Sequence, residues 1–352
     1  MAGKTKKTDM LLKNILVVLC ILLGGIFTIM LGGTIYAEYL LSRLNYVDPT
    51  AVAETLSLEE LEAFQRENEI DDPDFTGPEM LDEDVVFESV PATVFKSEDV
   101  VNILLVGADY QNGDRPRSDS MILCTFNKTT NTITLTSIMR DMYVQIPGYK
   151  NNRINASYFY GGMTLLEGTL NRNFGVETDG MVEIDFKHFR QLINMLGGIE
   201  LDLSYKEAQF INLKTGSQLE PGVQVVTGRQ ALWYSRFRGD AGGDFNRTNR
   251  QRIVLTTLLE EYKSKSLPEL LVLMHEILPM VTTNMTKDQI TFYVTDLFPM
   301  LTSAKIVTQR IPVEGAYYQA RINGMAVLVP DIPKNVKALA KTFEVLEPES
   351  VG

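Results

Sequence analysis

The chain has 352 residues, 45% of them hydrophobic, and a formal net charge of −12 at pH 7, so it can bury a sizeable core. Fifteen acidic residues and one basic residue between Asn45 and Phe95 account for this charge, and the rest of the chain is nearly neutral. A neutral remainder without a basic stripe argues against a nucleic-acid-binding protein, and two histidines outside any polar motif argue against a Ser-His-Asp hydrolase.

The first element is an uncharged run of 24 residues, residues 14–37, which is long enough to cross a membrane. Lysines precede it and an acidic segment follows, so residues 1–13 are predicted to be a cytoplasmic tail and the remainder extracytoplasmic. A cleaved signal peptide is the alternative, but the run is long for one and ends in a poor cleavage site. We therefore predict a single-pass protein of the cell membrane, held by a retained signal anchor.

An acidic segment follows over residues 38–95. Its prolines and self-repelling charge predict a mostly extended tether, and a small accessory unit is the alternative. Residues 56–68 within it have helical spacing. The amino-acid composition changes at residue 96, where runs rich in Val, Ile, Leu and Thr begin. A folded domain is therefore predicted over residues 96–352.

Strands and helices alternate in this domain. Strands are predicted over residues 100–109, 120–127, 132–141, 181–186, 199–204, 304–312 and 317–331, the last a hairpin. Helices are predicted over residues 157–175, with a break at Gly161-Gly162, and over 186–198, 227–237, 246–264, 267–278, 286–301 and 331–345. Buried strands with helices between them, and some strand pairs joined by short turns, predict an α/β fold: a three-layer α/β/α domain with a mixed central sheet.

Two aspartates lie where neighbouring strands are predicted to meet. Asp109 ends the first strand, and Arg117 and Asp119 lie at the entrance to the second. If the two strands pair, both carboxylates reach the same sheet edge, where they could hold Mg²⁺ together with phosphate oxygens. A turn or helix cap is the alternative for Asp109.

A second charged group follows the third strand. Arg140 and Asp141 come at its end, where a local ion pair is the alternative to a site. Arg140 should leave its strand at the edge where Asp109 leaves its own. Arg153 follows shortly afterwards and could equally be a surface charge at a helix start.

The stretch from Tyr234 to Arg252 contains five arginines and no lysine. Arg236 and Arg238 are two residues apart, so in an extended chain they would point the same way. The guanidinium fork matches two phosphate oxygens, so the choice of arginine indicates recognition of a multiply anionic group. A solvated surface is the alternative.

A long helix begins within this stretch. Arg247, Arg250 and Gln251 have the spacing i, i+3 and i+4, so they are expected to share one face. Cations at a helix N-terminus are unfavourable unless an anion arrives there, so this face indicates an anion site. Asp244 could simply cap the helix, and Arg252 could be a solvated residue.

Four successive stretches resemble the motifs of the LytR-CpsA-Psr family, from about Val100 to Leu346: NILLVGAD with RPRSDSMIL, LTSIMRDMYVQIPGYKNNRINASYFYGG, LGGIELDL, and TGRQALWYSRFR with DFNRTNRQR. The resemblance implies a catalytic α/β/α domain, residues 96–352, that encloses an apolar tunnel for a polyprenyl chain. SYFYGGMTLL and FRQLINML could line that tunnel, although ordinary core is the simpler interpretation. The family resemblance also implies a phosphotransferase that moves a glycopolymer, such as teichoic acid or capsule, from undecaprenyl pyrophosphate onto peptidoglycan.

The resemblance assigns roles by position. Asp109 and Asp119 match the family's ligands of Mg²⁺ or Mn²⁺. The matches to its pyrophosphate and head-group contacts are Arg117, Arg140, Arg236, Arg238, Arg247 and Gln251, while Arg250 and Arg252 match less well. Such a transfer needs positioning and charge stabilisation more than a nucleophilic side chain, so Arg140 is expected to be catalytic. Asp119 or Asp141 could accept the acceptor's proton, or Asp141 could only orient Arg140.

Two other functions stay open from the sequence. One is a regulatory or sensory protein that binds polyprenyl phosphates without chemistry, and the other is a polyprenyl pyrophosphatase that uses the same site. Lipid binding without turnover would indicate the first of these two.

Overall fold

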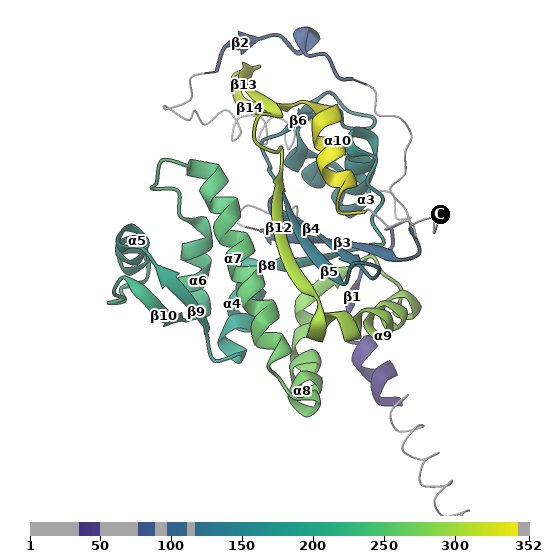
Figure 1. Cartoon of the computed structure of the whole chain (residues 1–352), viewed down its shortest axis with the longest axis vertical. Coiled ribbons are helices and arrows are strands. Elements are labelled where there is room, and N and C mark those ends of the chain that lie inside the picture. The colour runs from purple at the N-terminus through teal and green to yellow at the C-terminus, as the bar shows by residue number, and fades with distance from the viewer. Residues whose placement is uncertain (1–34, 50–76, 89–96, 111–116, 344–352) are drawn as a thin grey trace, which may run out of the picture.

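The computed structural model describes residues 35–49, 77–88, 97–110 and 117–343 (Figure 1). Within these ranges no helix is both long and apolar enough to cross a membrane. Apart from its last three residues, the predicted span over residues 14–37 lies outside the described part of the chain. The span and its orientation therefore stay predictions.

A seven-stranded mixed sheet lies at the centre of the molecule, in the order β1-β11-β8-β3-β4-β5-β12 (Figure 1). Its strands are β1 (Asn45–Tyr46), β11 (Val281–Thr283), β8 (Gly180–Asp185), β3 (Val100–Asp109), β4 (Arg117–Asn127), β5 (Thr132–Ile138) and β12 (Lys305–Ile311). The pairs β3/β4 and β4/β5 are antiparallel, whereas β8 and β12 run parallel to β3 and β5. The predicted mixed sheet is confirmed, and β3 and β5 end at the same edge.

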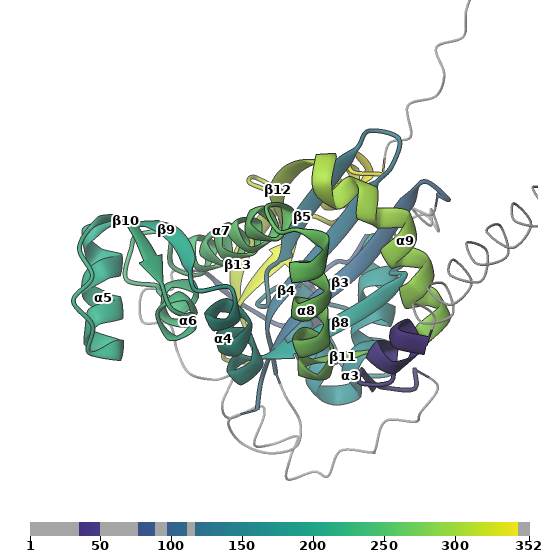
Figure 2. The same cartoon turned by 90° about the horizontal axis from the view of Figure 1, so that it is seen from below.

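Both faces of this sheet are apolar because successive side chains of a strand point to opposite sides. On one face Leu104 and Leu123 pack with α3 (Ile154–Phe174) and α10 (Ile332–Ala340). On the other, Ile103 and Leu135 pack with α7 (Gly243–Lys263) and α9 (Lys287–Ser303), as Figure 2 shows. Burying each such side chain contributes roughly 1.5–3 kcal/mol, so helices are held on both faces.

The predicted break in α3 is present. Gly161 and Gly162 have non-helical backbone angles, and φ of Gly162 is +60°. Residues other than glycine rarely adopt a backbone conformation with positive φ. The glycine pair therefore determines the position of the kink, as the sequence indicated.

A small lobe stands beside α7 (Figure 2). It contains α4 (Phe186–Met195), β9 (Ile199–Leu203), α5 (Tyr205–Thr215), β10 (Gly222–Val226) and α6 (Gly228–Arg236). These elements share a core of their own, which includes Ile211, Val226 and Ala231. The strand predicted over residues 199–204 therefore pairs with β10 in a two-stranded sheet rather than joining the central one.

The acidic segment over residues 38–95 joins the folded domain at two places. β1 pairs with β11, and β2 (Glu79–Met80) pairs with β13 (Tyr317–Ile322), which forms a hairpin with β14 (Met325–Pro330). At these two places the segment is part of a sheet rather than a tether, and the predicted helix over residues 56–68 lies outside the described part. The remaining elements are η1 (Asp82–Asp84), β6 (Tyr143–Val144), β7 (Asn152–Arg153), α8 (Leu267–Ile277) and η2 (Leu278–Met280).

Candidate active site

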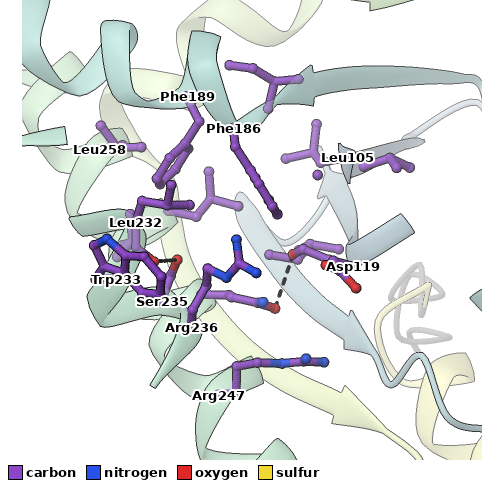
Figure 3. Close-up of a pocket in the computed structure, with 18 of the residues that line it drawn as sticks. Leu105, Asp119, Phe186, Phe189, Leu232, Trp233, Ser235, Arg236, Arg247 and Leu258 are labelled. Atoms are coloured by element: carbon purple, nitrogen blue, oxygen red, sulfur yellow. Dashed lines mark hydrogen bonds between the residues drawn. The ribbon is translucent and has the colours of Figure 1, made fainter. Parts of the chain in front are cut away.

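A cavity of about 650 Å³ lies between the central sheet and the helices α4, α6 and α7. Its apolar wall includes Leu105, Phe186, Phe189, Leu232 and Leu258, and its polar lining includes Asp119, Ser120, Arg140, Arg236, Arg238, Arg247 and Gln251. Figure 3 shows Phe186 and Phe189 on one side, Arg247 on the opposite side, and Arg236 and Asp119 between them. The cavity can therefore hold a molecule with an apolar body and an anionic group.

Asp119 is placed by an irregularity in β4. Gly107 of β3 pairs with Ser120 and Ala108 pairs with Ser118, so Asp119 is an extra residue in a β-bulge. Such bulges turn a side chain away from the regular alternation. Asp119 lines the cavity, and its Oδ1 accepts a hydrogen bond of 2.7 Å from Nη1 of Arg140.

Arg140 comes two residues after β5, at the sheet edge predicted for it. Its Nε lies 3.7 Å from Oδ1 of Asp141. Burial alone would lower the pKa of the guanidinium, but the carboxylates of Asp141 and Asp244 outweigh burial, and its pKa is raised. The group is therefore a permanent cation at the cavity.

The first turn of α7 adds a second carboxylate–arginine group. Asp244 lies 3.2 Å from Nη2 of Arg238 and accepts a hydrogen bond of 2.8 Å from Nη2 of Arg247. The helix cap is Gly242, so Asp244 does not cap α7. Burial, and then the charge of Asp141, raise the pKa of Asp244 to about 6.

Positive charge is in excess at this end of the cavity. Among the side chains that the structure describes, the ion-pair network that reaches from the cavity lining to Arg153 has five guanidinium groups and three carboxylates, an excess of two: Arg140, Arg153, Arg236, Arg238 and Arg247 against Asp119, Asp141 and Asp244. Buried charges are stable when they are paired, so this excess favours a ligand that brings at least two negative charges.

Arg236 and Gln251, which the resemblance assigns to the head-group contacts, both line the cavity. The Arg236 guanidinium stacks over the rings of Phe186, at 4.9 Å, and Trp233, at 5.5 Å, at the boundary between the two linings. The Gln251 carbonyl accepts a hydrogen bond of 3.1 Å from the Ser120 hydroxyl.

The three arginines of α7 have different partners, although Arg247 and Arg250 are only about 60° apart around the helix. Arg247 faces the cavity. Arg250 does not, and the predicted shared face is wrong for it: it donates to Glu207 at 2.5 Å and to Asp240 in the small lobe. Arg252 is only 7% exposed, so its interpretation as a solvated residue is also wrong.

Two predicted residues are described by their backbone alone. Asp109 and Arg117 are paired across β3 and β4, so the predicted strand pairing is confirmed, while their side chains lie outside the described part of the chain. Among the residues that the structure describes, no group of three or more Asp, Glu, His or Cys could hold a metal ion.

Other residues differ from the sequence interpretation or were missed. Arg153 does not line the cavity: its Nη2 donates to the Ala326 carbonyl at 2.7 Å, and its Nε lies 3.7 Å from Asp141. Lys214 and Trp233 line the cavity, and only the fold of the small lobe brings them there. FRQLINML does contribute cavity wall, whereas SYFYGGMTLL belongs to the core on the other face of the sheet.

Comparison with known proteins gives one family. The model of the LytR_cpsA_psr family matches residues 60–343. Regulatory protein MsrR of Staphylococcus aureus is 34% identical over 166 residues, which are 47% of this chain and 50% of the relative. The teichoic acid transferase TagU of Bacillus mycoides, in full polyisoprenyl-teichoic acid–peptidoglycan teichoic acid transferase, is 33% identical over 201 residues, 56% of this chain and 64% of TagU. The chain thus spans about half the length of the first of these curated relatives.

Solved structures agree with the fold. TagT, a Bacillus subtilis protein, bound to LIIa-WTA has a TM-score of 0.59 and 27% identity, with 73% of this chain and 95% of that one covered. The family protein YwtF (TagT) with bound octaprenyl pyrophosphate lipid has a TM-score of 0.55 and 25% identity, over 73% of this chain and 94% of that one.

Proposed function

Because the chain belongs to the LytR_cpsA_psr family, we propose that it is a phosphotransferase that moves an anionic glycopolymer from undecaprenyl pyrophosphate onto peptidoglycan. The amphipathic cavity carries this proposal: its apolar wall suits a polyprenyl chain, and its excess positive charge suits a pyrophosphate. The names of relatives add support, since TagU is a teichoic acid transferase and YwtF (TagT) has a bound octaprenyl pyrophosphate.

In the proposed step, a sugar hydroxyl of peptidoglycan attacks the phosphorus that carries the polymer. A new phosphorus–oxygen bond forms, the pyrophosphate bridge breaks, and polyprenyl phosphate leaves with the bond's electron pair. Arg140, Arg238 and Arg247 would stabilise the negative charge that gathers on the phosphoryl oxygens. The hydroxyl proton would pass to Asp119, because Asp119 lines the cavity, while Asp141 would orient Arg140.

The family resemblance also implies a divalent cation, Mg²⁺ or Mn²⁺. Carboxylate oxygens are suitable ligands for these ions, and Asp119 lies in the cavity next to the strand end that carries Asp109, so the donor types fit. We propose that these two residues would hold the ion. When bound, it would neutralise charge on the pyrophosphate.

Two alternatives concern the same cavity. One is a regulatory protein that binds the lipid and performs no transfer, and a relative, MsrR, has the name of a regulatory protein. A pyrophosphatase would use water in place of the sugar hydroxyl, and it would release free polymer without peptidoglycan. Membrane anchoring through residues 14–37, with the domain outside the cytoplasm, is part of the proposal and would place the cavity near its lipid substrate.

The experiment compares the full chain in detergent with its Arg140→Ala variant, using a lipid-linked glycopolymer and isolated peptidoglycan. We expect the variant to lose transfer at least 1000-fold, as an arginine that stabilises a phosphoryl transition state would. It should retain its circular dichroism spectrum and some lipid binding. Unimpaired transfer by Arg140→Ala would contradict the proposal, lipid binding without turnover in the parent chain would favour the sensor, and polymer release without acceptor would favour the pyrophosphatase.

A further inference from the structure

Arg252 lies on α7 but, unlike Arg247 and Gln251, does not line the cavity. It follows Gln251 directly in the sequence, and α7 packs against β12, the last strand of the sheet. Its Nη2 donates to Oδ1 of Asn249, one turn earlier, at 3.1 Å. Its Nε and Nη1 are buried, and no group in the described part of the chain accepts a hydrogen bond from them.

A second arginine lies beside it. Arg310 of β12 pairs in register with Ser137, whose hydroxyl donates to the Thr248 carbonyl of α7 at 3.5 Å, and this contact brings Arg310 next to the Arg252 turn. Burial, and then the charge of Arg310, lower the pKa of Arg252 to about 10, so the Arg252 guanidinium is still charged at neutral pH.

Little negative charge lies near Arg252 and Arg310 to offset their positive charge. Arg310 stacks over the Phe245 ring at 4.2 Å and pairs with Glu314 at 2.7 Å, but the Glu314 side chain is 82% exposed. Such solvated pairs contribute little. Arg252 has no ion pair with a carboxylate among the described residues.

A purely structural arginine would look different. Arg250, on the same helix, ties α7 to other elements through Glu207, Asp240 and the Phe237 carbonyl. The hydrogen bond of Arg252 goes to Asn249 of its own helix, so it does not connect α7 to another element. A buried guanidinium with two donors that lack an acceptor destabilises the folded protein. A bidentate oxyanion would accept hydrogen bonds from both donors.

We propose that Arg252 and Arg310 form a second oxyanion site, on the β12 flank of α7, which binds a phosphate group outside the cavity. β12 is the edge strand of the sheet and the Arg310 side chain is 21% exposed, so a ligand reaches the pair from the side. The phosphate could be a free ion or a phosphodiester along an anionic polymer. The site needs no transfer reaction and goes beyond the proposed function.

The test uses the full chain in detergent with Nε of arginine labelled by ¹⁵N, and with the cavity first saturated by farnesyl pyrophosphate. Inorganic phosphate and a lipid-free glycerol phosphate oligomer are titrated separately. We expect a saturable shift of the Arg252 Nε–H signal and about tenfold weaker binding in Arg310→Gln. Tighter binding of the oligomer would identify the polymer as the source, and equal binding of both would identify a simple phosphate site.

Arg172, an exposed residue at the end of α3, provides the matched control, since Arg172→Gln should leave the titration unchanged. Farnesyl pyrophosphate binding should also be unchanged in Arg310→Gln, so a failure of this site is distinct from a failure of the proposed function. An unmoved Arg252 signal would overturn the proposal. The outcome of an adventitious ion only would overturn it as well. In that case the Arg252 signal would shift only at phosphate concentrations that also shift the Arg172 signal.

A stability measurement separates binding from a structural role. Arg252→Met removes the uncompensated charge and keeps most of the volume, so we expect its melting temperature to rise and its stabilisation by phosphate to disappear. A lower melting temperature with phosphate stabilisation intact would show that Arg252 only supports the fold, and the proposal would be wrong.

Discussion

Two arginine–carboxylate clusters lie next to α7, and they differ in how completely their charges are matched. In the cluster that we call the clamp, one arginine, Arg250, meets two carboxylates, Glu207 and Asp240, and the Phe237 carbonyl. Its side chain is 8% exposed, and its guanidinium also lies over the rings of Tyr234 and Phe237. The clamp joins α5, α7 and the chain after α6, and its charges leave no need for a ligand.

The second cluster is the arginine–aspartate set of the cavity, and it remains unbalanced. Its positive excess faces a cavity, and the Nε atoms of Arg140 and Arg247 are buried without a hydrogen-bond acceptor in the described part of the chain. The comparison teaches that the same two residue types support the fold where every donor of the arginine has an acceptor, and bind an anion where cations exceed carboxylates.

The largest effect should come from breaking the clamp. Arg250→Ala leaves Glu207 buried and Asp240 without its partner, so we expect the free energy of unfolding to fall by about 3–5 kcal/mol. Chemical denaturation measures this, with exposed Arg229→Ala of α6 as the control that should change it by less than about 0.5 kcal/mol. A loss of less than 1 kcal/mol for Arg250→Ala would show that the clamp is not structural.

At the cavity, a substitution is expected to reduce transfer activity strongly and stability only slightly. Arg238 is 46% exposed on its side chain and pairs with Asp244, so Arg238→Ala should change stability by about 0.5 kcal/mol or less. Transfer should fall about 100-fold, or roughly 2.7 kcal/mol, because one donor to the phosphoryl oxygens is lost. Transfer kinetics and denaturation are measured on the same preparation. A stability loss as large as that of Arg250→Ala would remove the distinction between the clusters.

The sequence predicted the central sheet well, because its signals are local. The apolar runs of β3, β4 and β5 and the short turn over residues 128–131 between β4 and β5 are visible without tertiary information. The sheet edge shared by Asp119 and Arg140 followed from strand direction alone, and their hydrogen bond agrees with it.

Where prediction failed, the deciding contacts were distant in the sequence. Arg247 and Arg250 are three residues apart, and only the partners of Arg250, 43 residues away in Glu207 and 10 away in Asp240, assign it to the clamp. The burial of Arg252 depends on how α7 lies against β12, which no spacing within α7 reports. The small lobe was partly missed because β10 exposes Val223 and Val225 and is only five residues long.

The smallest expected effect concerns the charge of Asp244, which adjusts how unbalanced the cavity cluster is. Burial, and then Asp141, raise its pKa to about 6 from 3.8. The folded protein therefore holds this proton more tightly than the unfolded chain, so the contribution to stability is complete below pH 3.8 and is lost as pH rises through 6. The wild-type chain should lose about 1–2 kcal/mol between pH 4 and pH 8 relative to Asp244→Asn, which cannot titrate there.

The same proton changes the ligand site. Protonated Asp244 no longer neutralises Arg238 and Arg247, so the positive excess grows as pH falls below 6, and farnesyl pyrophosphate should bind more tightly. The pyrophosphate also titrates in this range, so the informative quantity is the difference between the wild-type chain and Asp244→Asn in calorimetry at pH 5 and pH 8. We expect the wild-type affinity to change about threefold more than that of the variant. Parallel pH profiles would mean that Asp244 stays ionised between its two arginines, and the positive excess of the cavity cluster would then not grow as the pH falls.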